Sequence, residues 1–235
     1  MNVLGIVPAR GGSRTIPRKN LVEVGGRPLL AWTAEAARGS ATLSRIVLTT
    51  DDEDIAAAGR RLGLEVPFLR PAALATDDAA MVPVLRHVLD VLRERERYMP
   101  DAVALLQPTS PLRTAAHIDR AVRLLADTGA DSVVSVVEVP HQFSPMSVLR
   151  LDGDRLRPFA GGATLSRRQD KPVLYARNGP AVLVARTRVV VEQDSLYGDD
   201  SRALVMTAEE SVDIDGPWDL ELADWLLRRR EMRVS

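Results

Sequence analysis

The feature that most constrains the fold is a repeated alternation of short, uninterrupted apolar runs with longer amphipathic segments. Runs such as 2–7 (NVLGIV), 45–49 (RIVLT) and 102–106 (AVALL) predict strands buried on both faces of a parallel sheet. The intervening segments, such as 28–38 and 81–95, place apolar residues on one helical face. The pattern predicts an α/β fold in which a Rossmann-like, mostly parallel sheet carries helices on both faces.

The alternation continues along the chain and is interrupted once. Further strands are expected at 65–68, 132–137, 181–185 and 203–206, and further helices at 51–62, 117–126 and 217–230. Residues 139–172 break the pattern with four prolines and a dense run of charge. We interpret residues 1–235 as a single domain in which 139–172 form an inserted, protruding arm.

Composition excludes several classes of function. The formal net charge of −1 gives no overall field that would attract nucleic acid or an anionic membrane, and no apolar stretch approaches the length of a membrane span. The absence of cysteine excludes disulfides, thiolate zinc sites and a cysteine nucleophile. A cytoplasmic protein without nucleic-acid or membrane partners is therefore expected.

The loop after the first predicted strand, residues 8–20, has the composition of a polyphosphate site. Gly11 and Gly12 let backbone N–H groups approach an anion, and Ser13 adds a hydroxyl donor. Four cationic side chains fall within ten residues: Arg10, Arg14, Arg18 and Lys19. The loop matches neither the P-loop nor the dinucleotide-binding glycine motif. The alternative interpretation is a solvated basic turn.

Other segments that could contact a ligand also follow predicted strands, which is where open parallel sheets bind their ligands. Residues 107–113 (QPTSPLR) place polar side chains between two prolines, although an ordinary capped loop would look similar. Asp213 and Asp215 alternate, so an extended segment would point both carboxylates to one side, as a hard cation such as Mg²⁺ requires. Capping of the last helix is the alternative for this pair. Asp51 and Asp52 have the position of helix caps, with a metal or ribose as the other possibility.

Residues 9–20 (ARGGSRTIPRKN) resemble the glycine-rich signature of the acylneuraminate cytidylyltransferases, the family of the CMP-sialic acid synthetases. Further similar segments follow in the same order: 25–30 (GGRPLL), 49–52 (TTDD), 69–71 (LRP), 75–77 (ATD), 106–113 (LQPTSPLR), 131–135 (DSVVS), 178–179 (NG) and 211–215 (SVDID). The resemblance covers nearly the whole chain.

The resemblance implies transfer of CMP from CTP to an acidic sugar, sialic acid or another nonulosonic acid, with release of pyrophosphate. It implies Mg²⁺ at Asp213 and Asp215, which with Arg10 and Arg14 make up the expected catalytic set. It assigns the nucleotide to Ala9, Arg10, Gly11, Gly12, Ser13, Arg14, Asn20, Arg70 and Ala79. It also implies a homodimer formed through the arm, in which the arm reaches the neighbouring subunit's site. The acceptor is expected at Gln107, His141, Arg168, Gln169, Lys171, Arg177 and Asn178.

Several residues depart from the family pattern, and they leave alternatives open. Thr15 replaces a glycine and would be strained if the loop required a positive φ. Gly216 replaces a threonine, while Ala176 and Pro180 fall near the expected acceptor pocket. The acceptor could therefore instead be a small phosphonate or 3-deoxy-octulosonic acid. An alternative of another class is a nucleotide-binding regulatory protein without turnover. Packing or surface roles are expected for His87 and His117.

Overall fold

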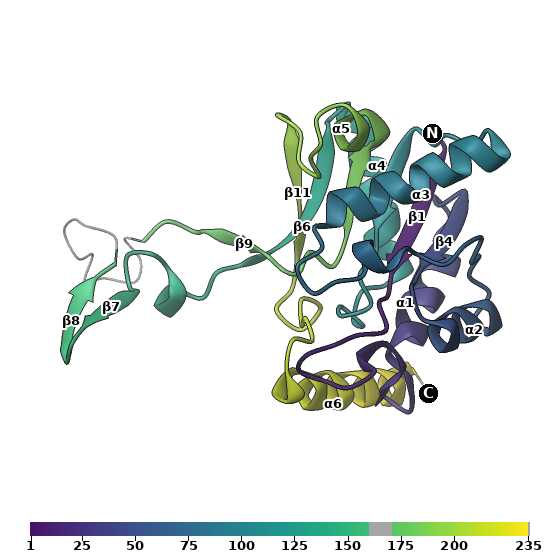
Figure 1. Ribbon diagram of the computed structural model, residues 1–235. Coiled ribbons are helices and arrows are strands. Elements are labelled where there is room, and N and C mark those ends of the chain that lie inside the picture. The colour runs from purple at the N-terminus through teal and green to yellow at the C-terminus, as the bar shows by residue number, and fades with distance from the viewer. Residues whose placement is uncertain (160–170, 235) are drawn as a thin grey trace.

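The computed structural model describes residues 1–159 and 171–234, which fold around one central sheet (Figure 1). Seven described strands form it in the order β11-β6-β10-β5-β1-β4, with β9 paired to β6. The strands are β1 (Val3–Pro8), β4 (Arg45–Thr49), β5 (Ala102–Leu105), β6 (Ser132–Glu138), β9 (Tyr175–Arg177), β10 (Leu183–Arg186) and β11 (Ser201–Met206). β9 and β10 run against the others, so the sheet is mostly parallel, as predicted.

Helices cover both faces of the sheet, because successive strand residues point to opposite sides. Val3 and Val7 pack with α1 (Leu29–Arg38), α2 (Glu53–Arg61) and α4 (Ala115–Thr128). Leu4 and Ile6 pack with α3 (Met81–Glu96) and α5 (Thr187–Val191). The strand predicted at 65–68 is wrong: Glu65 makes a single bridge to Val47, and Pro67 has no N–H to extend the pairing.

A third apolar cluster closes the end of the body beside the glycine-rich loop. It joins α6 (Pro217–Val234) to the hairpin β2 (Glu23–Val24) and β3 (Arg27–Pro28). Gly25 turns the hairpin at φ 58°, and a Cβ there would lie 2.6 Å from the Trp32 ring. Its N–H donates to Asp224 of α6 at 2.7 Å, which fixes the helix against the hairpin. The sequence pattern does not predict these two short strands.

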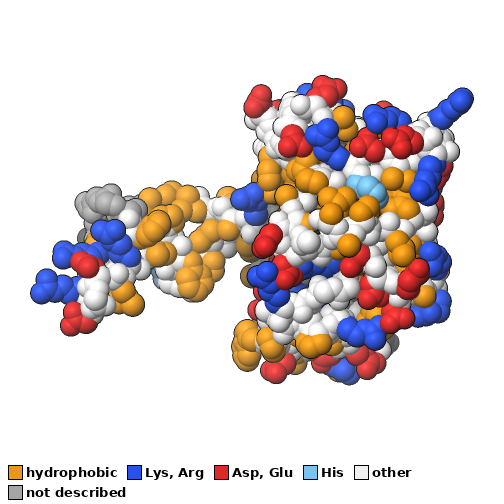
Figure 2. Space-filling view, in the orientation of Figure 1, with side chains coloured by type: hydrophobic (Ala, Val, Ile, Leu, Met, Phe, Trp, Pro, Cys, Tyr) orange, Lys and Arg blue, Asp and Glu red, His pale blue; other side chains and the backbone are white. Residues whose placement is uncertain are grey.

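The chain leaves the body after β6 and returns through β9, forming the protruding arm that Figure 1 shows. Its described part holds a 3₁₀ turn η3 (His141–Phe143) and the hairpin β7 (Leu149–Asp152) and β8 (Arg155–Pro158). Two further 3₁₀ turns in the described residues are η1 (Lys19–Leu21) and η2 (Ala72–Leu74). Apolar side chains gather on the arm surface in Figure 2. No helix in the described part of the chain combines the length and the apolar character needed to cross a membrane.

Candidate active site

A cleft of about 560 Å³ opens at the carboxyl ends of β1 and β5. The glycine-rich loop forms one wall, residues 70–84 form another, and the turn after β5 meets Asp215 between them. The predicted site residues that line it are Arg10, Gly12, Ser13, Arg14, Asn20, Arg70, Ala79, Gln107 and Asp215. The structure therefore brings together side chains that are up to two hundred residues apart in sequence.

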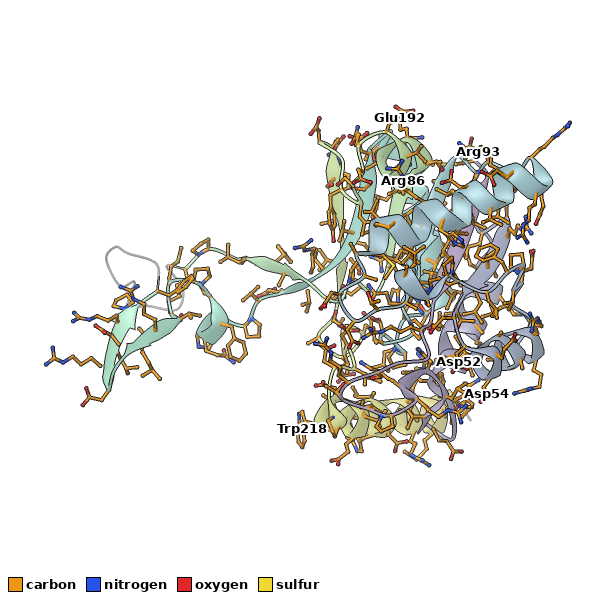
Figure 3. All side chains as sticks on the ribbon, in the orientation of Figure 1. Asp52, Asp54, Arg86, Arg93, Glu192 and Trp218 are labelled. Carbon is orange, nitrogen blue, oxygen red and sulfur yellow. The ribbon has the colours of Figure 1, made fainter. Side chains whose placement is uncertain are left out.

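The first part of the glycine-rich loop is held by the end of β4. The Ala9 N–H donates to the Thr49 carbonyl at 3.0 Å, and the Gly11 N–H donates to the Asp51 carboxylate at 3.0 Å. A Cβ at Gly11 would lie 2.7 Å from the Asp52 carboxylate, so only glycine fits. Ala9 and Gly11 thus anchor the loop beneath the cleft. Asp52, labelled in Figure 3, caps α2 by accepting from the Ile55 N–H at 2.9 Å.

The later part of the loop is tied to the segment that carries both aspartates. Thr15 Oγ1 donates to the Asp215 carbonyl at 2.6 Å, and Lys19 Nζ donates to the Ile214 carbonyl at 2.8 Å. The described non-glycine residues with positive φ are Arg18, Arg97 and Asp194. The strain considered for Thr15 is therefore absent, and its hydroxyl provides a link that glycine could not make.

Arg10 and Arg14 converge on one anion, the carboxylate of Asp77. Arg10 Nη1 lies 2.5 Å from Asp77 Oδ1, and Arg14 Nε donates to Oδ2 of the same carboxylate. The Arg14 guanidinium, with that of Arg10, holds the pKa of Asp77 below its usual range. Planar guanidinium groups arranged in this way also fit the oxygens of a phosphate. The sequence motif 75–77 contained Asp77 but gave no signal for this contact.

Arg70 forms a buried corner of the cleft beside Asn20. Its side chain is 6% exposed, and its Nη2 donates to the Thr49 carbonyl at 3.1 Å. Its Nε is buried without a hydrogen-bond partner among the described residues, while burial lowers the pKa of the guanidinium. Asn20 Nδ2 donates to the Arg10 carbonyl at 2.9 Å. An unpaired buried donor favours a ligand with a carbonyl acceptor, such as a nucleobase.

The segment with Asp213 and Asp215 is held in place through the residue between them. The buried Ile214 donates its N–H to the Thr109 carbonyl at 2.8 Å. Asp213 is half-buried and accepts from Ser110 Oγ at 3.2 Å, whereas Asp215 is exposed in the cleft. Burial raises the pKa of Asp213, and the nearby charge of Asp215 acts in the same direction.

This pair suits a divalent cation that is bound mainly by its substrate. The described residues contain no cluster of three or more His, Asp or Glu side chains able to hold a metal. Mg²⁺ typically takes one or two carboxylates and completes its shell with phosphate oxygens and water. Asp215 offers one carboxylate in the lining of the cleft, beside Arg10 and Arg14, and Asp213 lies two residues before it, outside that lining.

Arg113 is a buried residue of the site that the sequence analysis did not single out. Its Nη1 donates to the carbonyls of Gln107 at 2.9 Å and Ala181 at 2.8 Å, and its Nη2 donates to Thr33 Oγ1. Burial lowers its pKa to about 9. The side chain therefore holds both ends of the 107–113 turn against the residues that lead into β10.

The predicted acceptor residues are divided between the body and the arm. Gln107 reaches the cleft, where its Nε2 lies 3.4 Å from the Gly179 carbonyl. His141 and Lys171 line a separate hollow of about 640 Å³ at the base of the arm. The Arg177 guanidinium lies 4.9 Å over the Tyr197 ring, away from the cleft lining. Arg168 and Gln169 lie outside the described residues.

Asn178 has an internal position in this chain. It is 5% exposed, accepts from Ser135 Oγ at 2.6 Å and donates to Ser211 Oγ at 2.8 Å. It therefore joins β6 to the turn before Asp213 and does not line the cleft. The histidines on α3 and α4 pack as expected. His87 contacts Phe68 edge-on at 5.0 Å, and His117 accepts from the Thr114 N–H at 3.1 Å.

Comparison with known proteins identifies a family and several related chains. A family model described as cytidylyltransferase matches residues 4–228. The chain is 33% identical to the CMP-N,N'-diacetyllegionaminic acid synthase of Legionella pneumophila over 100% of this chain and 98% of that protein. It is 34% identical to the N-acylneuraminate cytidylyltransferase of Escherichia coli over 94% of this chain, but it spans only 51% of that protein. It is 28% identical to a pseudaminic acid cytidylyltransferase of Campylobacter jejuni over 97% of both chains.

Solved structures with low sequence identity share the fold. A structure of CMP:2-keto-3-deoxy-manno-octonic acid synthetase complexed with CTP matches with a TM-score of 0.71 and 16% identity, covering 98% of this chain and 100% of that one. The 4-diphosphocytidyl-2C-methyl-D-erythritol synthase of Anaerococcus prevotii matches with a TM-score of 0.65 and 13% identity, covering 97% and 96%. These matches support the sheet architecture.

Proposed function

The chain belongs to the cytidylyltransferase family, and on that premise we propose that it transfers CMP from CTP to an acidic sugar of the nonulosonic class. The observation that carries the proposal is the convergence of Arg10 and Arg14 on one anion in the cleft that Asp215 also lines. The related enzymes are named for legionaminic, pseudaminic and N-acylneuraminic acids. Because these three acids differ, we propose the class of the acceptor and do not name one acid.

The proposed reaction is a direct in-line displacement at the α-phosphorus of CTP. A hydroxyl oxygen of the sugar forms the new bond to phosphorus as the bond to the pyrophosphate oxygen breaks, and the hydroxyl proton is lost to water. Such a transfer needs positioning and charge neutralisation and no side-chain nucleophile. Arg10 and Arg14 neutralise the charge that develops on pyrophosphate. The unpaired Nε–H of Arg70 is suited to donate a hydrogen bond to a carbonyl of the base.

Asp213 and Asp215 are proposed to hold Mg²⁺. The ion would reduce the repulsion between an anionic acceptor and the triphosphate. The contribution of this chain is the placement of the two carboxylates. Ser110 orients Asp213, while the hydrogen bonds of Ile214 to Lys19 and Thr109 fix the segment between them.

The acceptor site is proposed to be completed by the arm of a second subunit in a homodimer. Of the described acceptor residues, only Gln107 lines the cleft of its own chain, while His141 and Lys171 lie at the base of the arm. The arm also exposes large apolar side chains that a partner would cover, including Phe143 at 65% and Phe159 at 68%. Arg168 and Gln169 belong to the same proposed contribution. A reaction that consumes CTP in a chain without cysteine favours the cytoplasm.

Pyrophosphate release from each of the four nucleoside triphosphates tests this proposal, with and without Mg²⁺. The acceptor panel contains N-acylneuraminic, legionaminic and pseudaminic acids, 3-deoxy-octulosonic acid and small phosphonates. Turnover is expected with CTP and a nonulosonic acid. CTP binding in calorimetry without turnover across the panel would favour the nucleotide-binding regulator instead.

A pair of variants in one loop sharpens the test. Arg14 lines the cleft, whereas Arg18 of the same loop pairs with Asp54 at 2.6 Å and does not line it. Arg14→Ala should lower kcat/KM for CTP by roughly 10²-fold, as expected for a group that contacts developing charge. Arg18→Ala should change it less than about threefold, since exposed ion pairs contribute little. Equal losses would contradict the assignment of the triphosphate to this cleft.

A further inference from the structure

The helix α6 is apolar on two faces. Its inner face packs Ala223 and Leu227 into the cluster with the β2–β3 hairpin. Its outer face exposes four large apolar side chains, spaced four, three and seven residues apart: Trp218 at 73%, Leu222 at 37%, Trp225 at 54% and Met232 at 73%. These intervals place them on one side of a helix. We call this set the α6 stripe.

The α6 stripe exposes a sizeable apolar area. The chain has three tryptophans, and the stripe exposes two of them. Taking up to 250 Å² as the full area of a tryptophan, the two indoles alone expose about 300 Å². Contiguous apolar patches of this size on single chains often mark interaction sites. Figure 3 shows Trp218 at one end of α6, pointing away from the body.

Two charged residues beside the stripe have no partner of opposite charge within the described part of the chain. Glu221 makes no ion pair or hydrogen bond there, and the Arg229 guanidinium only stacks on Trp225, 5.1 Å from the ring centroid. By contrast, Asp224, on the side facing the hairpin, accepts two hydrogen bonds. It accepts from Arg228 at 2.7 Å and from the Gly25 N–H. Opposite charges are thus left available on the same face as the apolar stripe.

We propose that the α6 stripe pairs with the same stripe of a second copy, antiparallel, about a two-fold axis at Trp225. In such a pairing, residues equally far before and after position 225 face each other. Glu221 and Arg229 lie four residues on either side of Trp225, so Glu221 faces Arg229 of the partner subunit, twice per interface. Trp218 and Met232 lie seven residues on either side and face each other in the same way. Every residue of the α6 stripe except Leu222 then faces another residue of the stripe, and Glu221 and Arg229 face each other.

The charges also exclude the parallel arrangement. A parallel pair in register would place Glu221 against Glu221 and Arg229 against Arg229, and like charges in contact oppose association. The helix has 18 residues and is about 27 Å long. A single helix pair buries less than the roughly 800 Å² per partner of a standard interface, so this contact is weak and reversible. No residue of the α6 stripe lines the cleft.

Single-cysteine cross-linking tests the register directly, because the natural chain has no cysteine. Under mild oxidation, Trp225→Cys should form a covalent dimer, since both copies of this position meet at the axis. Trp218→Cys alone should not, because its two copies would lie about 21 Å apart along the helices. A mixture of Trp218→Cys with Met232→Cys should form the dimer again. No product from Trp225→Cys, or equal product from the two single variants, would overturn the proposal.

Charge reversal provides an independent test in the full chain. Sedimentation at increasing protein concentration follows association beyond the dimer proposed through the arm, and Glu221→Arg or Arg229→Glu should each weaken that association by at least about tenfold. The double variant Glu221→Arg/Arg229→Glu should return to within about threefold of the natural chain. All four proteins should keep the same pyrophosphate release, so a failure of this proposal is distinguishable from a failure of the proposed activity. Unchanged association in the single variants, or no rescue in the double variant, would contradict the pairing.

Discussion

The body and the arm use the same kinds of side chain in opposite ways. In the body, leucines such as Leu85 on α3 and Leu105 on β5 are fully buried between a helix layer and the sheet. On the arm hairpin, Leu149, Leu151 and Leu156 are 50%, 74% and 64% exposed. The body thus buries these leucines within one chain, whereas the arm hairpin leaves its leucines exposed. Figure 2 shows the apolar side chains that lie at the surface of the arm.

The difference separates two parts of the proposed reaction. The residues that suit phosphate, base and metal all come from the body, where buried contacts such as those of Arg113 and Ile214 fix them. Of the described residues proposed for the acceptor, His141 and Lys171 lie at the base of the arm, which we propose meets a second subunit. Substitutions in the body should therefore affect turnover with every acceptor, and substitutions in the arm should affect the acceptor or the assembly.

The largest effect is expected from Asp215→Asn in the body. The Asp215 side chain makes no hydrogen bond with the described residues, so the fold should remain intact while one proposed metal ligand is lost. We expect kcat/KM to fall roughly 10³-fold, similar to the loss of a group aimed at the transition-state charge. Pyrophosphate release and the Tm measure the two effects. Glu209→Gln, on an exposed turn before the same segment, is the control and should leave both unchanged.

The matching substitution in the arm is Lys171→Met. Lys171 donates to Ser147 Oγ at 2.7 Å and lines the hollow at the arm base. Its loss should raise KM for the acidic acceptor and leave KM for CTP unchanged. An equal rise in both KM values would break the separation between body and arm.

The next effect is a loss of stability, which we expect in the variant Arg113→Met. This change leaves the carbonyls of Gln107 and Ala181 and the hydroxyl of Thr33 without their buried donor. Each unsatisfied buried group costs about 1 kcal/mol or more, so the free energy of unfolding should fall by roughly 3 kcal/mol. The Tm should then fall by about 6–12 °C in a chain of this size. Arg123→Met on exposed α4 surface is the control, and an equal shift there would contradict the positioning role of Arg113.

The sequence predicted the sheet and its helices because each element contains a strong local pattern. The buried runs at β1, β4 and β5 are apolar without alternation, and that property alone indicates a strand covered on both faces. The antiparallel direction of β10 could not be read from its residues, since both directions bury the same side chains. The short β2–β3 and β7–β8 hairpins were missed because two to four residues are too few for a periodic pattern.

The site was predictable where a residue type itself indicates the chemistry, and not where the role depends on a distant partner. Glycines followed by arginines after a strand indicate an anion site in any such fold. The pairing of Arg10 with Asp77 joins positions 67 residues apart, and the contact of Thr15 with Asp215 spans 200 residues. Asn178 resembled a ligand-binding residue in its motif, but its environment between Ser135 and Ser211 is decided by the packing of β6.

The same substitution should have different effects on stability in the two regions. Leu85→Ala removes a fully buried side chain and should lower the free energy of unfolding by about 2–5 kcal/mol. Leu151→Ala removes one that is 74% exposed and should change it by less than about 0.5 kcal/mol at concentrations where the protein is dissociated. Urea unfolding at two protein concentrations measures both. A concentration-dependent loss for Leu151→Ala alone would show that the arm is covered in the assembly.

The smallest effect is expected at Asp77, whose carboxylate contacts the two arginines as a phosphate group would. Asp77 occupies the two arginines that CTP would need, so binding of the triphosphate must displace its carboxylate. Asp77→Asn keeps the shape of the side chain and removes its charge, and KM for CTP should fall by roughly twofold to fivefold because exposed ion pairs are weak. The neighbouring Asp78→Asn is the matched control. Its carboxylate is 94% exposed and lies 3.9 Å from Arg14, so KM should barely change. A higher KM for Asp77→Asn would mean that Asp77 orders the arginines for CTP and does not compete with it.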